Sequence, residues 1–229
     1  MDGLLLVDKP KGWTSFDVVA KVRGVVKKKT GIKRAKVGHT GTLDPLATGL
    51  LVLTIGKYCK RAQEFSKLDK TYQVTMKLGQ TSTTGDEEGE KTIISTEMPP
   101  QSAIEEALQL FVGDSMQTPP IYSAIKVNGK RAYDLARQGK EVKLEPRPIH
   151  IYSNILQNVG VSDRVVGFES KVSSGTYIRS LVEDIGTKLG TGAYMSDLRR
   201  VSVGDFALEN AITISDDLYD QVEDAIVQH

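Results

Sequence analysis

Short apolar runs alternate with amphipathic stretches along the whole chain. The runs Gly3–Asp8 and Leu50–Ile55 are almost continuously apolar, which predicts two buried strands. Lys70–Leu78 alternates between apolar and polar residues, so its strand should bury only one face. That face would carry Tyr72, Val74 and Met76. Two further strands are expected over 148–159 and 164–172.

Helices are predicted where apolar residues recur every three or four positions. The first helix would begin after Thr14 or Ser15, either of which could cap it, and run to about Lys28. Its wide apolar face would bury Phe16, Val18, Val19, Val22, Val25 and Val26. Further helices are expected over 58–65, 101–111 and 177–189, and residues 79–90 form a polar, acidic turn region.

Composition limits the class of protein. A chain of 229 residues with 39% hydrophobic residues can form one large domain or two small ones. The longest apolar run is far too short for a bilayer, and the N-terminus lacks a basic leader, so we expect no membrane partner. The single Cys59 excludes an internal disulfide framework and fits a reducing compartment, which predicts a cytoplasmic location.

The charges are divided unevenly along the chain. Residues 1–80 carry 16 Lys and Arg against 6 Asp and Glu, whereas residues 81–229 carry 14 against 23. A basic face built from the N-terminal third would neutralise phosphates and bind nucleic acid in a salt-dependent way. A simpler interpretation is that the lysines and arginines of 27–36 only solvate a loop.

The stretch from Lys36 to Lys57, KVGHTGTLDPLATGLLVLTIGK, presents one acid, Asp44, on a loop of small residues beside an apolar strand. Pro45 favours an extended backbone at Asp44, and the neighbouring glycines allow a close approach to a ligand. An isolated Asp-Pro is more often a turn or a helix cap. The length of the surrounding motif makes a functional site the stronger hypothesis.

This string resembles the G-H-x-G-x-L-D-P-x-A-T-G-x-L-x-V motif of the TruB family, the pseudouridine synthases that modify the T loop of tRNA. The matching positions are Gly38, His39, Gly41, Leu43, Asp44, Pro45, Ala47, Thr48, Gly49, Leu50 and Val52. Four other strings are also similar to family motifs and extend the resemblance from Asp8 to Phe206. They are DKPKGWTS, PPIYSAIKVNGKRAYDLAR, SSGTYIRSL and GAYMSDLRRVSVGDF.

The resemblance implies site residues. Asp44, Tyr72 and Arg179 would be catalytic, with Arg179 pairing with Asp44 and Tyr72 lying against the target base. His39, Leu198 and Lys9 would contact the substrate nucleotide or its RNA. An insertion over 118–147 would close over the RNA loop through Tyr122, Lys126, Arg131, Tyr133 and Arg137. The plainer alternatives are a core tyrosine, a solvent-facing arginine, a buried loop histidine and an ordinary hairpin with a helix.

The resemblance also implies a reaction and a fold. The enzyme would flip the T-loop uridine at position 55 of tRNA into a pocket, cleave the N1–C1′ bond with Asp44 and rejoin the base through C5. The fold would be mixed α/β, with a largely antiparallel central sheet flanked by helices. No nucleotide-binding fingerprint follows the glycines, and the three His and one Cys lack metal-ligand spacing. We therefore expect neither a cofactor nor a metal. We also expect the protein to be a monomer.

Two other functions remain open from the residues. One is a catalytically idle module that binds or folds tRNA, and the other is a hydrolytic glycosidase, which normally needs a second placed carboxylate. The chain is expected to form one catalytic domain over 1–229, with an acidic tail or helix over 209–229. Most bacterial relatives continue into a PUA-type RNA-binding domain, which these last residues are too few to build, so a short form or a truncation is expected.

Overall fold

The computed structural model describes residues 1–229 except 124, 128, 139–141, 216 and 228–229. The chain forms two compact units: unit 1 comprises residues 1–73 and 198–229, and unit 2 comprises residues 74–197. Two strands, β4 (Lys70–Leu78) and β12 (Ala193–Val203), have residues in both units. Within the described residues, no helix is both long and apolar enough to cross a bilayer.

Unit 1 is built on β1 (Gly3–Lys9), which pairs antiparallel with β3 (Thr48–Ile55) along its whole length. β2 (Val37–His39) adds antiparallel to β3, while β14 (Ile212–Thr213) and β15 (Ile226–Val227) pair with β1. Residues of β1 and β3 are almost all fully buried. Both predicted apolar strands are therefore confirmed.

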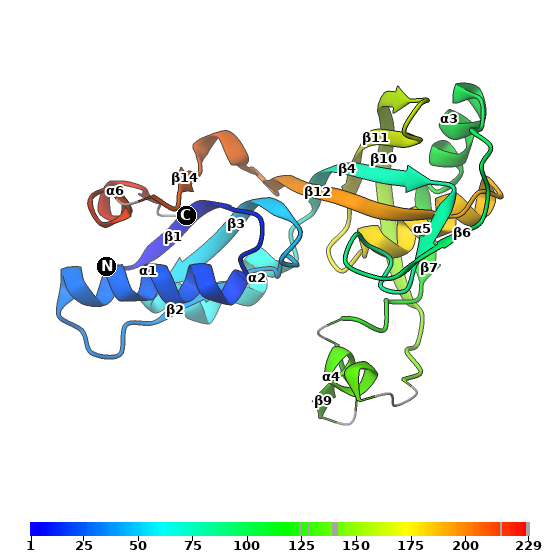
Figure 1. The fold of residues 1–229 in the computed structure, drawn as a ribbon. Helices are drawn as coiled ribbons and strands as arrows, with labels where there is room; N and C mark the ends of the chain where they lie inside the picture. Colours follow the sequence, from blue (N-terminus) through cyan, green and yellow to red (C-terminus); the bar gives the residue numbers. More distant parts are fainter. Residues whose placement is uncertain (124, 128, 139–141, 216, 228–229) are drawn as a thin grey trace. The chain divides into compact units, whose positions relative to one another are not determined.

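Helix α1 (Ser15–Thr30) lies along β1 and β2 in Figure 1 and packs on the sheet through every third or fourth residue. Thr14 is the N-cap: its hydroxyl accepts from the Asp17 amide, and the Asp17 carboxylate accepts from the Thr14 amide at 2.8 Å. Gly31 ends the helix in the left-handed conformation with φ of 70°. The predicted helix is confirmed, and the choice of cap is settled as Thr14.

The prediction that Phe16 is buried is wrong, because 62% of its surface is exposed. The buried stripe of α1 runs through Ser15, Val18, Val19, Val22 and Val26. Position 16 lies outside that stripe. The Arg23 guanidinium instead lies over the Phe16 ring, with its central carbon 5.8 Å from the ring centre. The helix expected over 58–65 is also only partly right, because the chain forms a 3₁₀ helix, η1 (Gly56–Arg61), before α2 (Ala62–Ser66).

The C-terminal residues belong to unit 1. After β13 (Phe206–Ala207) and η2 (Leu208–Asn210), helix α6 (Leu218–Asp224) places Leu218 and Val222 in the core beneath α1. A helix was one of the two forms expected for this segment. The short strands on either side of α6 were not expected, because two paired residues leave no hydrophobic pattern.

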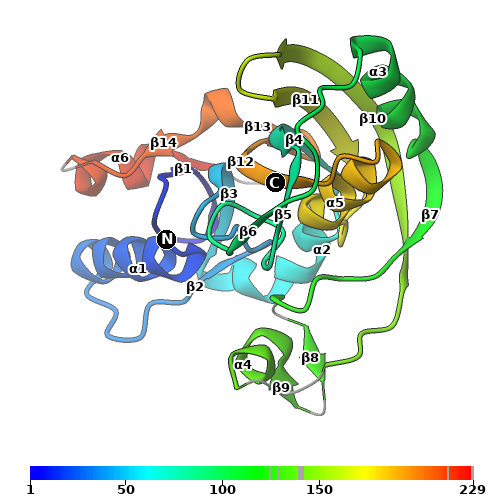
Figure 2. The same ribbon diagram turned by 45° about the vertical axis from the view of Figure 1, so that its right-hand side comes forward.

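Unit 2 contains β10 (Arg147–Gly160), which pairs antiparallel with β11 (Val165–Val172) and β7 (Gly113–Gln117). Helix α3 (Gln101–Leu110) lies beside β10 in Figure 2, and its last turn is bonded to β10 through Asn154. Helix α5 (Ile178–Lys188) follows β11. β10, β11, α3 and α5 confirm the predictions for this part of the chain within one or two residues, whereas β7 has no counterpart among them.

The stretch predicted as a polar turn contains a hairpin, in which β5 (Gln80–Ser82) pairs with β6 (Lys91–Ile93). A second small hairpin, β8 (Lys126–Val127) with β9 (Lys130–Arg131), precedes α4 (Ala132–Arg137).

Strand β12 was not predicted. Its polar centre, SDLRR, hides the pattern, although its ends are apolar and buried. The overall class is confirmed as mixed α/β, with a largely antiparallel central sheet flanked by helices.

Candidate active site

Asp44 lies half-buried on the loop between β2 and β3, and the peptide groups beside it are fixed. The Ser15 hydroxyl accepts from the Leu43 amide at 2.8 Å and donates to the Leu43 carbonyl at 3.0 Å. The Gly12 amide donates to the Pro45 carbonyl at 2.8 Å. The start of α1 therefore holds the residues on both sides of Asp44, which positions the carboxylate before any substrate binds.

Lys9 lies beneath the same loop. Its side chain is fully buried, and its ammonium donates to the carbonyls of Pro10, Trp13 and Pro45 at 3.0, 2.6 and 3.4 Å. Burial lowers the pKa of Lys9 to about 8, while the negative charge of Asp44 opposes that shift and Arg200 adds to it. These bonds make Lys9 part of the loop's support. Its predicted contact with the substrate stays a prediction.

Three other predicted residues of the pocket lie in unit 1. Tyr72 on β4 and Leu198 on β12 are buried, with 8% and 7% of their surfaces exposed. His39 on β2 is half-buried, and its Nδ1 is buried without a hydrogen-bond partner among the described residues. Burial, and to a smaller extent the charge of Arg200, lowers the pKa of His39, so the ring is neutral at pH 7. The roles of the three residues stay predictions.

Arg179 lies in unit 2, in the first turn of α5, with only 5% of its surface exposed. The guanidinium donates to the Thr84 carbonyl at 3.1 Å and to the Tyr122 carbonyl at 2.8 Å, and Nη1 lies 3.5 Å from the Asp86 carboxylate. Asp86 thus compensates a buried cation near a helix N-terminus. The predicted pairing of Arg179 with Asp44 stays a prediction, because the two residues belong to different units.

Asp86 was missed by the sequence analysis. It is 5% exposed, and its Oδ1 accepts from the Thr84 hydroxyl at 2.5 Å and from the Glu88 amide at 3.1 Å. The only signal in the sequence was the run TTGDEEGE, which is typical of a solvated turn. One acid of such a turn can be buried only if a distant cation accompanies it, and the sequence does not indicate which acid that is.

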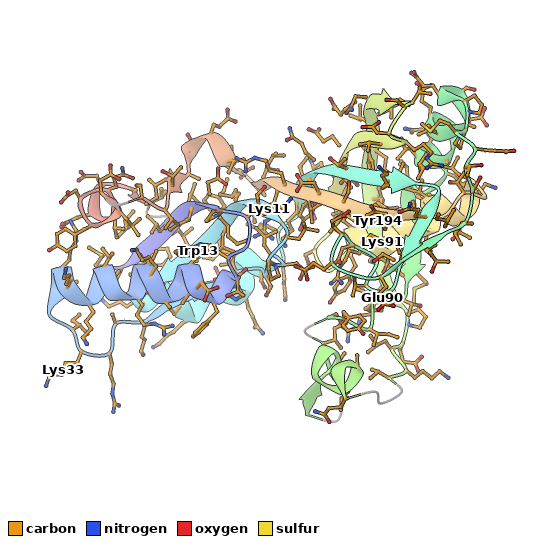
Figure 3. The ribbon with its side chains drawn as sticks, in the orientation of Figure 1. Lys11, Trp13, Lys33, Glu90, Lys91 and Tyr194 are labelled. Atoms are coloured by element: carbon orange, nitrogen blue, oxygen red, sulfur yellow. The ribbon has the colours of Figure 1, made fainter. Side chains whose placement is uncertain are left out.

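The loop that carries Asp86 is bonded to its neighbours. The Lys91 ammonium donates to the carbonyls of Glu87 and Gly89 at 2.6 and 2.7 Å, and it lies 4.5 Å from the centre of the Tyr194 ring. Lys91 and Tyr194 are both labelled in Figure 3. Burial, with a hydrogen bond to Glu87, raises the pKa of Tyr194 to about 12. The position of Asp86 is therefore determined by packing as well as by Arg179.

The environment of Arg179 is acidic. Burial raises the pKa of Glu183, and the charge of Asp184 raises it further, whereas Arg179 lowers it. Burial also raises the pKa of Asp184. The charges of Asp86 and Glu183 both act on Arg179, so its immediate surroundings are acidic.

The predicted RNA-clamping residues are only partly described. Tyr122 has 36% of its surface exposed, and its carbonyl accepts from Arg179. The nearby Thr118 carbonyl accepts from the Ser180 hydroxyl at 3.2 Å. The base of the segment is thus bonded to α5. The side chains of Lys126, Arg131, Tyr133 and Arg137 lie outside the described residues, and their roles stay predictions.

A basic hollow of about 410 Å³ lies beside β2 in unit 1. Its charged lining residues are Arg23, Arg34 and Lys36, and no carboxylate is among the described residues that line it. Arg23 is anchored there by donating to the Val37 carbonyl at 3.1 Å. This hollow gives part of the predicted basic face a definite position, next to the strand that carries His39.

Comparison with known proteins identifies the family of this chain. Residues 27–178 match the N-terminal domain of the TruB family pseudouridylate synthases, and residues 179–227 match the tRNA pseudouridylate synthase B C-terminal domain. The tRNA pseudouridine synthase B of Clostridium novyi (strain NT) is 48% identical over 227 residues, which are 99% of this chain and 76% of that protein. The enzyme of the same name from Aquifex aeolicus (strain VF5) is 43% identical over 94% of this chain and 73% of its own length.

Solved structures agree. A chain in the crystal structure of a Cbf5-Nop10-Gar1 complex superposes with a TM-score of 0.72 at 31% identity, over 98% of this chain and 57% of that chain. A chain in the structure of an H/ACA RNP bound to a substrate RNA containing 2′-deoxyuridine superposes with a TM-score of 0.69 at 29% identity. The match covers 98% of this chain and 56% of that chain. The fold and the family match together define a pseudouridylate synthase. The chain belongs to the TruB family, as the sequence motifs predict.

Proposed function

We propose that this protein isomerises uridine to pseudouridine in tRNA, at the T-loop uridine numbered 55. The named activity of its relatives supports tRNA as the substrate. One observation in this chain supports it most: the only acid of the glycine-rich loop lies between two peptide groups that α1 and its preceding turn hold in place. Such a loop presents a carboxylate to a flipped nucleotide without reorganisation.

The reaction needs no redox change. The N1–C1′ bond breaks, the uracil turns while bound, C5 joins C1′, the C5 proton leaves to solvent and N1 takes up a proton. Asp44 acts on the ribose in its ionised form, either as a nucleophile at C1′ or as a base at C2′. A primary isotope effect with 2′-deuterated uridine would assign Asp44 to the second role, and a rate unchanged by deuterium would assign it to the first.

The other residues take roles around this step. Tyr72 stacks on the uracil, a contact worth about 1–3 kcal/mol, and Leu198 lines the same pocket. Arg179 pairs with the Asp44 carboxylate and keeps it ionised. His39, neutral and lacking a partner at Nδ1 among the described residues, contacts the RNA and helps to hold the target nucleotide out of its stack.

The RNA is held by basic and aromatic groups. The segment 118–147 clamps the T arm through Tyr122, Lys126, Arg131, Tyr133 and Arg137, because aromatic faces stack on unpaired bases and cations meet phosphates. The hollow lined by Arg23, Arg34 and Lys36 contributes further phosphate contacts. Affinity should therefore fall steeply as salt is raised.

The test is release of tritium from a T-arm stem-loop that carries [5-³H]uridine, comparing the parent protein with Asp44→Asn. Asn keeps the shape of the side chain and removes its charge. We expect release by the parent, none above background by the variant, and equal RNA affinity for both by fluorescence anisotropy. Far-ultraviolet circular dichroism checks that the variant is folded.

Other results would contradict the proposal. Binding without release by either protein, on the stem-loop and on whole tRNA, would indicate a module that binds or folds tRNA without catalysis. Free uracil as the product would indicate a glycosidase. Equal release by parent and variant would remove Asp44 from the chemistry.

We also place the protein in the cytoplasm as a monomer. An unpaired Cys59 fits a reducing compartment. Sedimentation equilibrium at two protein concentrations tests the monomer, and a mass near 50 kDa, about twice the 25.1 kDa of the chain, would contradict it.

A further inference from the structure

Two consecutive arginines on β12 have different environments. The Arg199 guanidinium is partly exposed and lies 2.6 Å from the Asp8 carboxylate, which makes it an ordinary ion pair. Arg200 is 2% exposed, and among the described residues its hydrogen-bond acceptors are two main-chain carbonyls. A buried guanidinium that stays charged and has no carboxylate partner is costly, so its position needs an explanation.

The two carbonyls lie on opposite sides of Asp44 in the sequence. Arg200 Nε donates to the Leu50 carbonyl at 2.7 Å, and Nη2 donates to the Gly41 carbonyl at 3.1 Å. One rigid guanidinium therefore joins the start and the end of the loop 41–50. Ser15 and Gly12 hold the residues next to Asp44, and Thr40 donates to the Val52 carbonyl at 3.0 and 3.2 Å just outside the loop, so Arg200 adds the bridge between Gly41 and Leu50.

The main chain of Arg200 contacts the same loop. Arg200 pairs in parallel register with Gly49, where φ is 97°. A Cβ at position 49 would lie 2.3 Å from the Arg200 carbonyl oxygen, so only glycine fits this approach. The loop thus ends against the Arg200 main chain, and the Arg200 side chain bridges its first and last residues.

We propose that Arg200 is a positioning residue for the reaction: its guanidinium fixes the separation of Gly41 and Leu50 and thereby places the Asp44 carboxylate against the ribose. This inference rests on the proposed function of Asp44. Arginine is needed here for its geometry. Its planar guanidinium donates to two carbonyls in fixed directions, whereas a lysine ammonium is a point donor on a flexible stem. A displacement of about 1 Å at a reacting group can cost about 10²-fold in rate.

The experiment compares Arg200→Lys and Arg200→Met with the parent by tritium release, measuring kcat and KM for the T-arm stem-loop. We expect kcat to fall about 10²-fold in both variants while KM changes far less, since the hydrogen bonds of Arg200 go to the loop and not to the RNA-binding segment 118–147. Arg164→Lys is the matched control, because Arg164 also donates to a main-chain carbonyl, that of Ser95, in a different part of the fold. Its kcat should equal that of the parent.

Nuclear magnetic resonance of His39 separates geometry from charge. The chain has three histidines, so the His39 signal can be assigned by substitution. The charge of Arg200 contributes to the lowered pKa of His39. Arg200→Lys retains that charge and should retain the low pKa, whereas Arg200→Met should raise it. A slow Arg200→Lys enzyme with an unchanged His39 titration would show that the fork, and not the charge, is needed.

Several outcomes would overturn the inference. These are a kcat equal to that of the parent in either folded variant, a loss fully accounted for by the unfolded fraction, or failure of both variants to fold. If the parent itself releases no tritium, the proposed function fails instead.

Discussion

The two units place the predicted catalytic groups in surroundings of opposite charge. In unit 1, Asp44 lies on a loop supported by the buried cations Lys9 and Arg200, with Lys70 buried nearby. In unit 2, Arg179 lies among the carboxyl groups of Asp86 and Glu183. In each region the group expected to act is opposite in sign to the charged side chains named around it.

The two regions differ in how the majority charges are satisfied. The cations of unit 1 donate to main-chain carbonyls, and among the described residues Lys9, Lys70 and Arg200 form no ion pair within 4 Å. In unit 2 the buried Asp86 faces Arg179 directly at 3.5 Å. Removing a charged group should therefore lower the free energy of unfolding most where an ion pair is broken. It should lower it least where the removed group was buried without an ion-pair partner, because its burial no longer has to be compensated.

The largest effect on stability should come from Asp86→Asn. The substitution keeps the shape of the side chain but removes the negative charge that lies 3.5 Å from the buried Arg179 guanidinium. We expect the free energy of unfolding to fall by about 3 kcal/mol, at the lower end of the range for broken buried pairs, because two carbonyl acceptors remain. Urea unfolding followed by circular dichroism measures it. A change below about 0.5 kcal/mol, as for an ordinary surface site, would show that the pair is not structural.

Lys9→Met should have a pH-dependent effect. Below pH 8 both the folded and the unfolded chain hold the Lys9 proton, and above about 10.5 neither does. Between these values the unfolded chain binds more protons, so the free energy of unfolding rises with pH, by up to about 3 kcal/mol. The variant lacks this rise. At pH 7 the relief of charge burial and the loss of donors to Pro10 and Trp13 should nearly cancel.

Fluorescence of Trp13, the single tryptophan of the chain, follows this unfolding at pH 7 and pH 10. Lys70→Met is the matched control. Burial also lowers the pKa of Lys70 to about 8, but its ammonium donates to the carbonyls of Ser66 and Leu68 and not to those of the Asp44 loop. Each variant should lose the part of the rise in the free energy of unfolding that its own lysine contributes. Only Lys9→Met should also slow catalysis. Parallel pH profiles for parent and Lys9→Met would disprove the lowered pKa.

The smallest effect should come from Glu183→Gln, and it should have the opposite sign to Asp86→Asn. The pKa of Glu183 is raised in the folded chain, so stability falls as pH rises from 4.5 to the folded value. The neutral variant avoids this cost and should be more stable at pH 7 by less than about 1 kcal/mol, because the group is half-exposed and screened. Unfolding in urea at pH 4 and pH 7 measures the difference, which should vanish at the lower pH.

The sequence predicts those parts of the molecule that depend on neighbours along the chain. The strands β1, β3 and β4 follow from their apolar periodicity, and α1 follows from its stripe of valines and its Thr14 cap. The Asp44 loop was found because its motif is contiguous. These features need no information from distant residues.

The features that were missed depend on distant partners. β12 contains a polar centre, and Arg199 and Arg200 belong in a strand only because Asp8 and the carbonyls of the Asp44 loop accept from them. Asp86 is an acid in a turn until Arg179 is placed beside it. Arg199 and Arg200 both lie in a string that resembles a family motif. The residues beside them do not indicate which of the two is buried.

The bonds between Arg200 and the Asp44 loop span 150 and 159 residues of chain. During synthesis, Ser15 and Leu43 can meet early, because only 28 residues separate them. The pairing of β2 with β3 can close the base of the loop early, but the two Arg200 bonds cannot form until residue 200 has left the ribosome. A nascent chain can therefore complete the support of Asp44 only near the end of translation, and an incomplete chain would carry Asp44 on a loop that lacks the Arg200 bonds.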